Sequence, residues 1–205
     1  IGTNGTSGDG GAATSAQFEE LRDAAVDAAG NIYISDNNRV RKIDARTGKI
    51  KAVAGKAGIF TSYSGEGGPA AQAQIARTAG IAVDGSGNLY IAALSDNRIL
   101  KVDAGTGIIT TVAGTGAFGY SGDGGPAVNA KIFCPEGVEA DPAGNVYFTD
   151  NCNNLVRKID MDTGIITTVA GKVDGNTGTS GVPDSGGYNG DAIPAVQAQL
   201  NYPRD

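Results

Sequence analysis

The chain has 205 residues and a mass of 20.5 kDa, with 33 glycines and neither histidine nor tryptophan. Its 16 basic and 22 acidic side chains give a formal net charge of −6, which argues against a protein that neutralises the phosphates of a nucleic acid or an anionic membrane. Without histidine, imidazole-dependent triads and histidine-ligated zinc sites are excluded.

The chain repeats itself at an interval of 57 residues. Two motifs each occur three times: Ser-Gly-acid-Gly-Gly at 7–11, 64–68 and 121–125, and Gly-Asn-x-Tyr at 30–33, 87–90 and 144–147. A fourth copy begins at Tyr188, after a Gly- and Ser-rich insertion over 173–187, and runs to Leu200. Because such self-similarity marks a repeat architecture, we predict repeats over about 1–54, 55–113 and 114–170, with a partial repeat over about 171–205.

Within one repeat the apolar pattern has the period of strands. In the second copy, 80–84 and 88–93 are short apolar runs separated by a turn, 97–103 alternates, and 108–112 is β-branched after a second turn. The Asp-x-x-Gly turns at 27–30, 84–87 and 141–144 suit tight hairpins, since Asp accepts backbone hydrogen bonds and Gly takes positive φ. The sequence therefore predicts an all-β fold of four-stranded antiparallel sheets that stack as blades of a β-propeller.

The repeated segments resemble NHL repeats. The resemblance rests on three segments: Val26-Asp27-x-x-Gly30-Asn31-Ile32-Tyr33-Ile34-x-Asp36, the following stretch over 38–44, and the closing strand over 109–114. The connector over 120–127 is similar to that of bacterial extracytoplasmic and teneurin-like members. Propellers of this family serve as protein-binding platforms, RNA binders, sensors and occasionally lyases, so the resemblance implies a fold more firmly than a function.

Three complete repeats are fewer than the roughly four to eight blades with which propellers close. We therefore expect that the chain is part of a longer one forming a ring of six or more blades. The alternatives are that two copies assemble into a six-bladed ring, or that another subunit covers the ends.

Several acidic residues are candidate ligands of a calcium ion. Asp36 and Asp150 close the second strand of their repeats, where the middle repeat has Ala93, and they could form part of a carboxylate ring for Ca²⁺. We favour a role in capping the following turn and pairing with Arg39 or Arg157. One acid also lies in each glycine-rich connector, without the ligand alternation of an EF-hand, so we expect these acids to form turns: Asp9, Glu66, Asp123 and Asp191. No cofactor is predicted, with Ca²⁺ as the open alternative.

Glu139 is the one acidic residue in a predicted first strand, where the other repeats have Ala25 and Ala82. Because first strands line the axis of a propeller, Glu139 is a candidate channel residue, with an ordinary solvated side chain as the alternative. The basic clusters at 39–42 and 157–158 are interpreted as solvated outer strands, and no nucleic-acid partner is expected.

The two cysteines fall at the same end of the third repeat. Cys134 precedes its first strand, and Cys152 lies in the turn between its second and third strands. We predict a disulfide between them, which would contribute ~3 kcal/mol by the chain-entropy estimate. The alternative is a pair of reduced thiols, as expected of a cytosolic protein.

The leading hypothesis is a non-catalytic, extracytoplasmic module that binds a protein or glycan partner or docks in a larger assembly. Its contact face would contain the connectors and the second-to-third-strand turns, with four candidate contact residues in and beside the insertion: Asp174, Asn176, Asp184 and Tyr188. A calcium-dependent propeller lyase or lactonase is one alternative, and a structural subunit of a membrane-associated or filamentous complex is another. No apolar run approaches the roughly 18 residues of a membrane-spanning helix.

Overall fold

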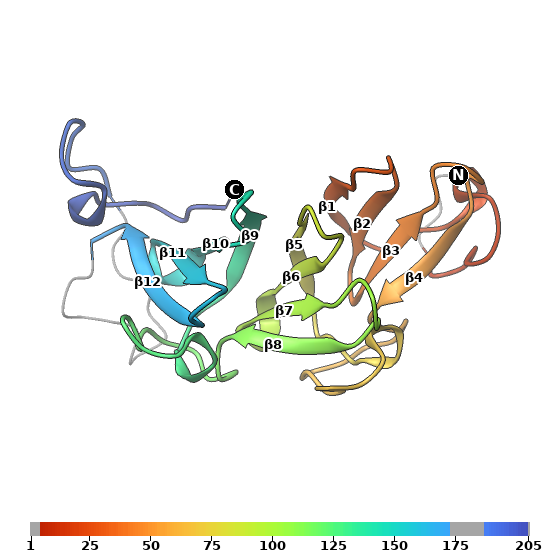
Figure 1. The fold of residues 1–205 in the computed structure, drawn as a ribbon, viewed down its shortest axis with the longest axis horizontal. Helices are drawn as coiled ribbons and strands as arrows, with labels where there is room; N and C mark the ends of the chain where they lie inside the picture. Colours follow the sequence, from red (N-terminus) through yellow and green to blue (C-terminus); the bar gives the residue numbers. More distant parts are fainter. Residues whose placement is uncertain (1–4, 173–186, 205) are drawn as a thin grey trace.

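A computed structural model of the chain describes residues 5–172 and 187–204 (Figure 1). The described part contains three four-stranded antiparallel sheets, and in each sheet the strand order is the chain order. Sheet 1 contains β1 (Leu21–Val26), β2 (Ile32–Asp36), β3 (Arg39–Ile43) and β4 (Ile50–Ala54). Sheet 2 contains β5 (Thr78–Val83), β6 (Leu89–Ala93), β7 (Arg98–Val102) and β8 (Ile109–Ala113). Sheet 3 contains β9 (Pro135–Ala140), β10 (Val146–Asp150), β11 (Leu155–Asp160) and β12 (Ile165–Ala170).

Short 3₁₀ turns occur in the connectors and before two of the third strands. They are η1 (Ala13–Ser15), η2 (Ala70–Gln72), η3 (Leu94–Asp96), η4 (Ala127–Asn129), η5 (Asn151–Asn153) and η6 (Ala195–Gln197). In the described part of the chain, no helix is long and apolar enough to cross a membrane.

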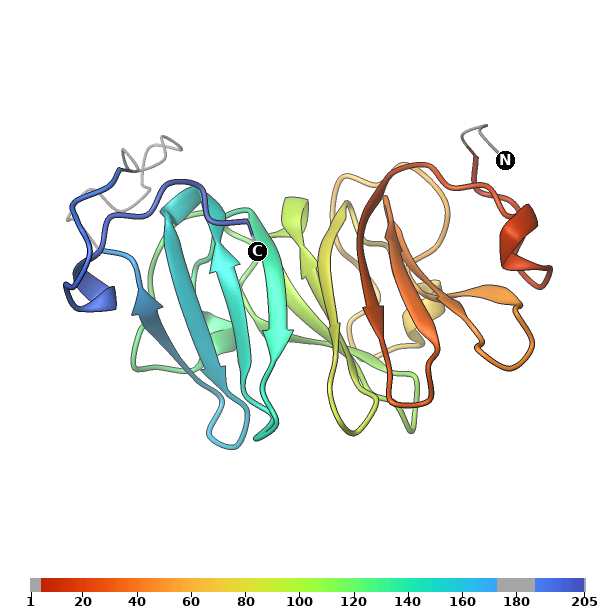
Figure 2. The ribbon, with the colours of Figure 1, turned by 90° about the horizontal axis from the view of Figure 1, so that it is seen from above.

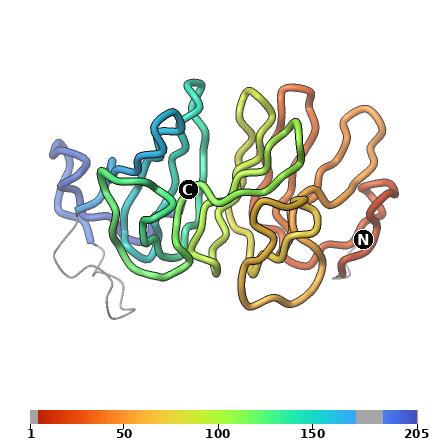
Figure 3. Tube along the Cα trace, turned by 60° about the horizontal axis from the view of Figure 1, so that its bottom comes forward, coloured from red at the N-terminus to blue at the C-terminus, as the bar shows by residue number. Residues whose placement is uncertain are grey.

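The three sheets stand side by side, with sheet 2 in the middle (Figure 2). Their first strands are the neighbours across the sheets, since β5 contacts both β1 and β9. The chain passes through each sheet in turn (Figure 3). Strands β1, β5 and β9 therefore form an inner row, and β4, β8 and β12 are the outer strands.

The hairpin between the first two strands forms as the Asp-x-x-Gly pattern predicts. In sheet 1 the Asp27 carboxylate accepts hydrogen bonds from the backbone N–H groups of Ala29 and Asn31, at 3.0 and 2.9 Å. Gly30 closes the turn with a φ of 79°. Burial would raise the Asp27 pKa, but the hydrogen bonds from Asn31 and Lys42 outweigh it and lower that pKa to about 2.

Two hydrophobic clusters hold the sheets together. Between sheets 1 and 2 the buried side chains include Tyr33, Leu89, Ile91 and Leu100. Between sheets 2 and 3 they include Tyr90, Ile99, Val138, Phe148 and Ile159. Sheet 2 is thus buried on both faces, which explains why every residue of β6 is apolar and buried.

The first three glycine-rich connectors each run along the outer strand of the sheet that follows them. Gly10 donates to the Ile50 carbonyl at 2.7 Å, and the later connectors repeat this bond from Gly67 to Ile109 and from Gly124 to Ile166. A strand edge left unpaired would invite association with other chains, and the connector covers it. The connector acids also contribute here, because they accept from outer-strand N–H groups: Ala52 to Asp9, Thr111 to Glu66, and Thr168 to Asp123. Asp9, Glu66 and Asp123 thus bond to the outer strands, a role beyond the turn formation predicted for them.

Buried arginines fasten two of the connectors. Arg41 is fully buried and donates to the Asp9 carboxylate and to the carbonyls of Ser7 and Gln17. Arg157 makes the equivalent set of contacts in sheet 3, with Asp123, Ser121 and Lys131. The prediction of solvated basic clusters is wrong for Arg39, Arg41 and Arg157, because the connector folds back over the third strand.

The predicted pairing of Asp36 with Arg39, and of Asp150 with Arg157, is confirmed at 2.8 and 3.5 Å. Each carboxylate also caps a connector N–H group, from Glu19 and Phe133 respectively, at 2.7 Å in both cases. The second repeat has Ala93 at this position, yet it keeps an equivalent cap from another residue. There the carboxylate of Asp96, three residues after Ala93, accepts the corresponding N–H of Ala76 at 2.9 Å.

Candidate functional site

The three inner strands share a β-bulge near their start. The strand register shifts between Leu21 and Ala24 in β1, between Thr78 and Ile81 in β5, and opposite Phe148 and Asp150 in β9. A bulge frees backbone groups from the ladder and re-aims side chains. Because the bulges recur at one position of the repeat, they gather at one place along the inner row.

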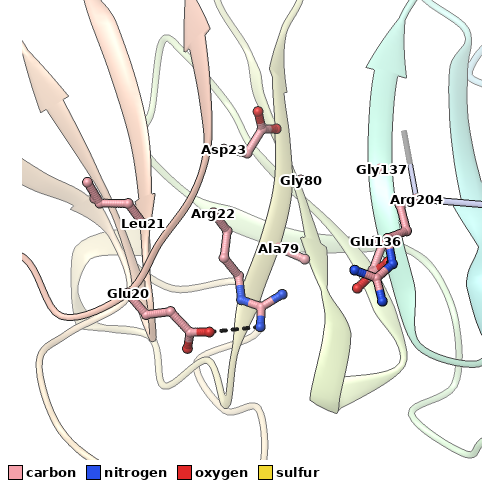
Figure 4. Close-up of a pocket in the computed structure, with 9 residues that line it drawn as sticks. All are labelled: Glu20, Leu21, Arg22, Asp23, Ala79, Gly80, Glu136, Gly137 and Arg204. Atoms are coloured by element: carbon pink, nitrogen blue, oxygen red, sulfur yellow. Dashed lines mark hydrogen bonds and ion pairs between the residues drawn. The ribbon is translucent and has the colours of Figure 1, made fainter.

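The bulged residues line a hollow of about 440 Å³ (Figure 4). Its walls are Glu20, Leu21, Arg22 and Asp23 from sheet 1, Ala79 and Gly80 from sheet 2, Glu136 and Gly137 from sheet 3, and Arg204. Four of these residues occupy the same position in successive repeats: Arg22, Ala79, Glu136 and Arg204. We call this the axial hollow.

Opposite charges meet around the axial hollow. Glu20 accepts from Arg22 at 2.8 Å and from Arg77 at 2.7 Å, so one carboxylate joins sheets 1 and 2. The hydrogen bond from Arg77 is the main reason that the pKa of Glu20 lies below its usual value. On the other side, Glu136 lies 3.5 Å from the Arg204 guanidinium and accepts from the Asn151 amide at 3.0 Å.

The floor of the axial hollow depends on small residues and one more carboxylate. Asp23 accepts the N–H of Ile81 at 2.8 Å and thereby ties the bulge of β1 to that of β5. A Cβ at Gly80 would lie 2.4 Å from the Glu136 carbonyl oxygen, so only glycine lets β5 and β9 approach this closely. Ala79 and Gly80 therefore leave room between the charged residues of sheets 1 and 3.

The hollow presents charged side chains that can form hydrogen bonds and ion pairs. It offers guanidinium and carboxylate groups that are partly exposed, the side chain of Arg204 by 78% and that of Glu136 by 18%. No serine or cysteine is among its lining residues. Over residues 5–172 and 187–204, no cluster of three or more Cys, Asp or Glu side chains could hold a metal ion. Polar and charged groups of a bound partner are what such a surface would contact.

Of the two acids of β9, Glu136 lines the axial hollow, whereas the sequence indicates Glu139 as the channel candidate. Glu139 is exposed on β9, opposite Tyr147 of β10, and does not line the hollow. The bulge at 136–137 changes which residues of the strand face the axis, and alternation alone could not show this. The usable signal was the divergence of Arg22, Ala79, Glu136 and Arg204 at one position of otherwise similar repeats.

The other predicted contact residues are placed only in part. Asp174, Asn176 and Asp184 lie outside the described residues. Tyr188 is 73% exposed, at the start of the fourth connector. From that connector, Arg204 reaches the axial hollow, and the carbonyl of Pro203 accepts from Asn151.

Cys134 and Cys152 lie in contact at the rim of sheet 3, as two half-buried thiols. The hydrogen bond between them raises the pKa of Cys134 and lowers that of Cys152. Cys134 has a φ of 52° and stands where the other repeats have Glu20 and Arg77, which form the ion pair between sheets 1 and 2. The disulfide stays a prediction.

Three meandering four-stranded sheets, with their first strands in an inner row, define a β-propeller repeat protein. The sequence pattern of the teneurin NHL domain family matches residues 117–205. Mouse teneurin-3 is 31% identical over 157 residues, 71% of this chain and 5% of that protein. The chain belongs to the NHL-repeat family.

The chain is also similar to two further proteins, one in sequence and one in structure. The Arabidopsis thaliana protein SUPPRESSOR OF QUENCHING 1, chloroplastic, is 27% identical over 138 residues, which are 64% of this chain and 13% of that protein. The solved structure of an auxiliary nutrient binding protein from Bacteroides thetaiotaomicron has a TM-score of 0.61 at 22% identity, covering 91% of this chain and 42% of that one. The chain thus spans less than half of each protein it is compared with, and the structural likeness supports the fold.

Proposed function

We propose that this chain is a non-catalytic interaction module that binds a protein or glycan partner at the axial hollow and the surrounding connector face. The proposal rests on a contrast between the residues that maintain the fold and the residues that line the axial hollow. The hairpin, connector and core residues recur from repeat to repeat, whereas the bulge position changes from Arg22 to Ala79, Glu136 and Arg204. Because the repeated residues already maintain the fold, residues that differ between repeats at one position can be selected for contact with a partner.

The charges favour a partner that presents both signs or many hydroxyls. Arg22 and Arg204 can donate paired hydrogen bonds to carboxylates or sugar oxygens, and Glu136 can accept from amines or hydroxyls. A solved structure of the same fold is titled an auxiliary nutrient binding protein, and that title is consistent with a binding role. We further propose an extracytoplasmic location, which the predicted disulfide would suit, although one relative is named as chloroplastic.

The test is a direct search for a ligand with matched variants. The purified chain is screened on a glycan array and on an array of charged peptides, and each binder is measured by calorimetry. Arg22→Gln and Glu136→Gln remove charge from the axial hollow at nearly constant size. Arg46→Gln removes an exposed charge from the turn between β3 and β4 and serves as the control.

We expect at least one binder whose affinity falls about tenfold or more with either axial variant and is unchanged with Arg46→Gln. Absence of any binder on both arrays, or equal affinity in all variants, contradicts the proposed site. Mass spectrometry of the ligand after incubation checks the other half of the proposal, because chemical conversion of the ligand would show an enzyme.

A further inference from the structure

A second concavity lies between sheets 1 and 2, away from the axial hollow. It is a groove of about 480 Å³ in which the polar residues Asp27, Tyr33, Lys42, Lys51 and Asp103 adjoin a mainly apolar wall. The apolar wall includes Val53 from β4, Pro69 and Ala70 from the connector, and Leu89 and Val102 from sheet 2. This size and mixture suit a small ligand with an apolar body.

The repeat provides an internal comparison for this groove. The equivalent space between sheets 2 and 3 is bordered by Ile159 and Met161, at the positions of Val102 and Ala104. Ile159 belongs to the core cluster there, and Met161 packs against it. The space between sheets 2 and 3 is therefore filled by larger side chains, whereas the smaller side chains between sheets 1 and 2 leave the groove open.

Sheet 1 also adds positive charge at the mouth of this groove. Lys51 of β4 stands directly opposite Lys42 of β3, whereas the other two sheets pair a lysine with Thr110 or Thr167. Like charges directly opposite on a sheet are unfavourable, so a second lysine here is not explained by folding. Lys49 lies two residues earlier on the same face, and it lines with Lys42 and Lys51 a smaller adjoining hollow of about 340 Å³.

The nearby carboxylates are already engaged. Asp103 accepts from the N–H and hydroxyl of Thr106 at 2.9 and 2.8 Å, within its own turn. Asp27 is held by its hairpin and by Lys42 at 3.2 Å. Lys51 is exposed and has no ion pair with any residue in the described ranges, so its ammonium group is available to an incoming anion.

We propose that the groove between sheets 1 and 2 binds a small amphiphilic carboxylate, with its apolar tail against Val53, Leu89 and Val102 and its carboxylate at Lys51. Lys42 and Lys49 add to the positive potential at the entrance. The apolar body contributes the burial, and the ammonium group selects the anion. This site is independent of the partner-binding face proposed above.

Octanoate is the probe, titrated into the full chain by calorimetry. We expect saturable binding, with weaker binding of 1-octanol and none of octylamine. Two substitutions taken from the other repeats test the site with little risk to folding. Lys51→Thr, which copies Thr110 and Thr167, should weaken binding about fivefold, the value of one partly exposed ion pair. Ala104→Met, which copies Met161, should abolish binding by filling the groove.

Thermal unfolding of each variant checks that the fold is intact, and Arg22→Gln should bind octanoate as the unmodified chain does. No binding of octanoate overturns the proposal. Binding that survives both Lys51→Thr and Ala104→Met overturns it as well. Loss of octanoate binding in Arg22→Gln would mean that the probe occupies the axial hollow instead.

Discussion

Sheets 1 and 3 bury an aspartate under the connector, but they neutralise it differently. Asp36 has two guanidinium groups near it, those of Arg39 at 2.8 Å and Arg41 at 3.6 Å. Among the residues that the structure describes, Asp150 has one guanidinium group near it, that of Arg157 at 3.5 Å, because Leu155 stands where sheet 1 has Arg39. Sheet 2 has no buried pair of this kind, because Ala93 and Leu100 replace the aspartate and the arginine. Its connector N–H group is capped by Asp96 instead. Burying a charge is expensive unless its partner is present, so each arrangement has to be complete.

Arg157→Leu should therefore destabilise the chain strongly. The change copies Leu100 but leaves the fully buried Asp150 without its cation, which costs about 3 kcal/mol. Transplanting the whole arrangement of sheet 2, as Asp150→Ala, Asn153→Asp and Arg157→Leu together, should restore most of the loss. Urea denaturation of the single and triple variants measures both. A triple variant no more stable than the single one would show that the arrangements are not interchangeable.

The weaker neutralisation of Asp150 also predicts a dependence on pH. Burial raises the pKa of Asp150 to about 6, against an ordinary value of 3.8, and the nearby Arg157 opposes this only in part. Since the folded state then binds a proton more readily than the unfolded state, the contribution of Asp150 to stability is present at low pH and is lost as pH rises through about 6. Relative to Asp150→Asn, the unmodified chain should gain about 1 kcal/mol between pH 7 and pH 5.

Urea midpoints of the two proteins at several pH values decide this. The carboxyl of Asp27, whose pKa is lowered to about 2, loses its contribution between pH 3.8 and about 2 and so lies outside the window. A constant difference between the two proteins from pH 7 to pH 5 would contradict a raised pKa at Asp150.

At the scale of the elements, the inner strands pack by way of a glycine. Gly80 of β5 approaches the backbone of β9 so closely that a Cβ would lie 2.4 Å from the Glu136 carbonyl oxygen. Gly80→Ala should push β5 and β9 apart and destabilise the chain by about 2 kcal/mol, with loss of any binding at the axial hollow. Gly85→Ala is the control, because a Cβ there meets nothing within 4 Å and its φ is not positive. Equal denaturation midpoints for Gly80→Ala and the unmodified chain would exclude a tight contact.

The strands, hairpins and repeat order could be predicted from sequence because each is encoded locally. Alternation within five or six residues gives a strand, and Asp27 and Gly30 are enough for a hairpin. The bulges could not be predicted, because they arise where an inner strand pairs with the second strand of its own sheet and also packs against the inner strand of the next sheet. For this reason the strand pattern indicates Glu139, whereas Glu136 is the residue of β9 that lines the axial hollow.

The buried arginines escaped prediction for a related reason. Arg41 and Asp9 are distant in sequence, and only the folded connector brings the carboxylate 2.7 Å from the guanidinium. A basic residue in an alternating strand otherwise indicates a solvated face. Charged residues that recur at one repeat position, as Arg41 and Arg157 do with Asp9 and Asp123, were the available sign of a conserved internal contact within this chain.

At the scale of the whole molecule, no calcium requirement is expected. Several carboxylates of the described ranges are paired with arginines or backbone N–H groups, as Asp36 and Asp123 illustrate, and no group of three or more there could hold a metal ion. The melting temperature should therefore be the same in millimolar Ca²⁺ and in chelator, because a bound ion would raise it by mass action. A rise of several degrees with Ca²⁺ would revive the calcium-dependent alternative.

The oxidation state of the two cysteines links the chain to its compartment. Oxidised glutathione can convert the contacting Cys134 and Cys152 thiols to a disulfide, taking two electrons and two protons and yielding two molecules of glutathione. Closing so short a loop restricts the unfolded chain by ~3 kcal/mol, so the oxidised protein should melt roughly 6 to 12 °C above the reduced protein. Cys152→Ser, which copies Ser95 of the second repeat, should show no such difference. Mass spectrometry after alkylation supplies the independent readout. Two modified cysteines in the folded, glutathione-treated protein, together with an unchanged melting temperature, would mean that the two thiols stay reduced. That result would remove the main support for an extracytoplasmic location.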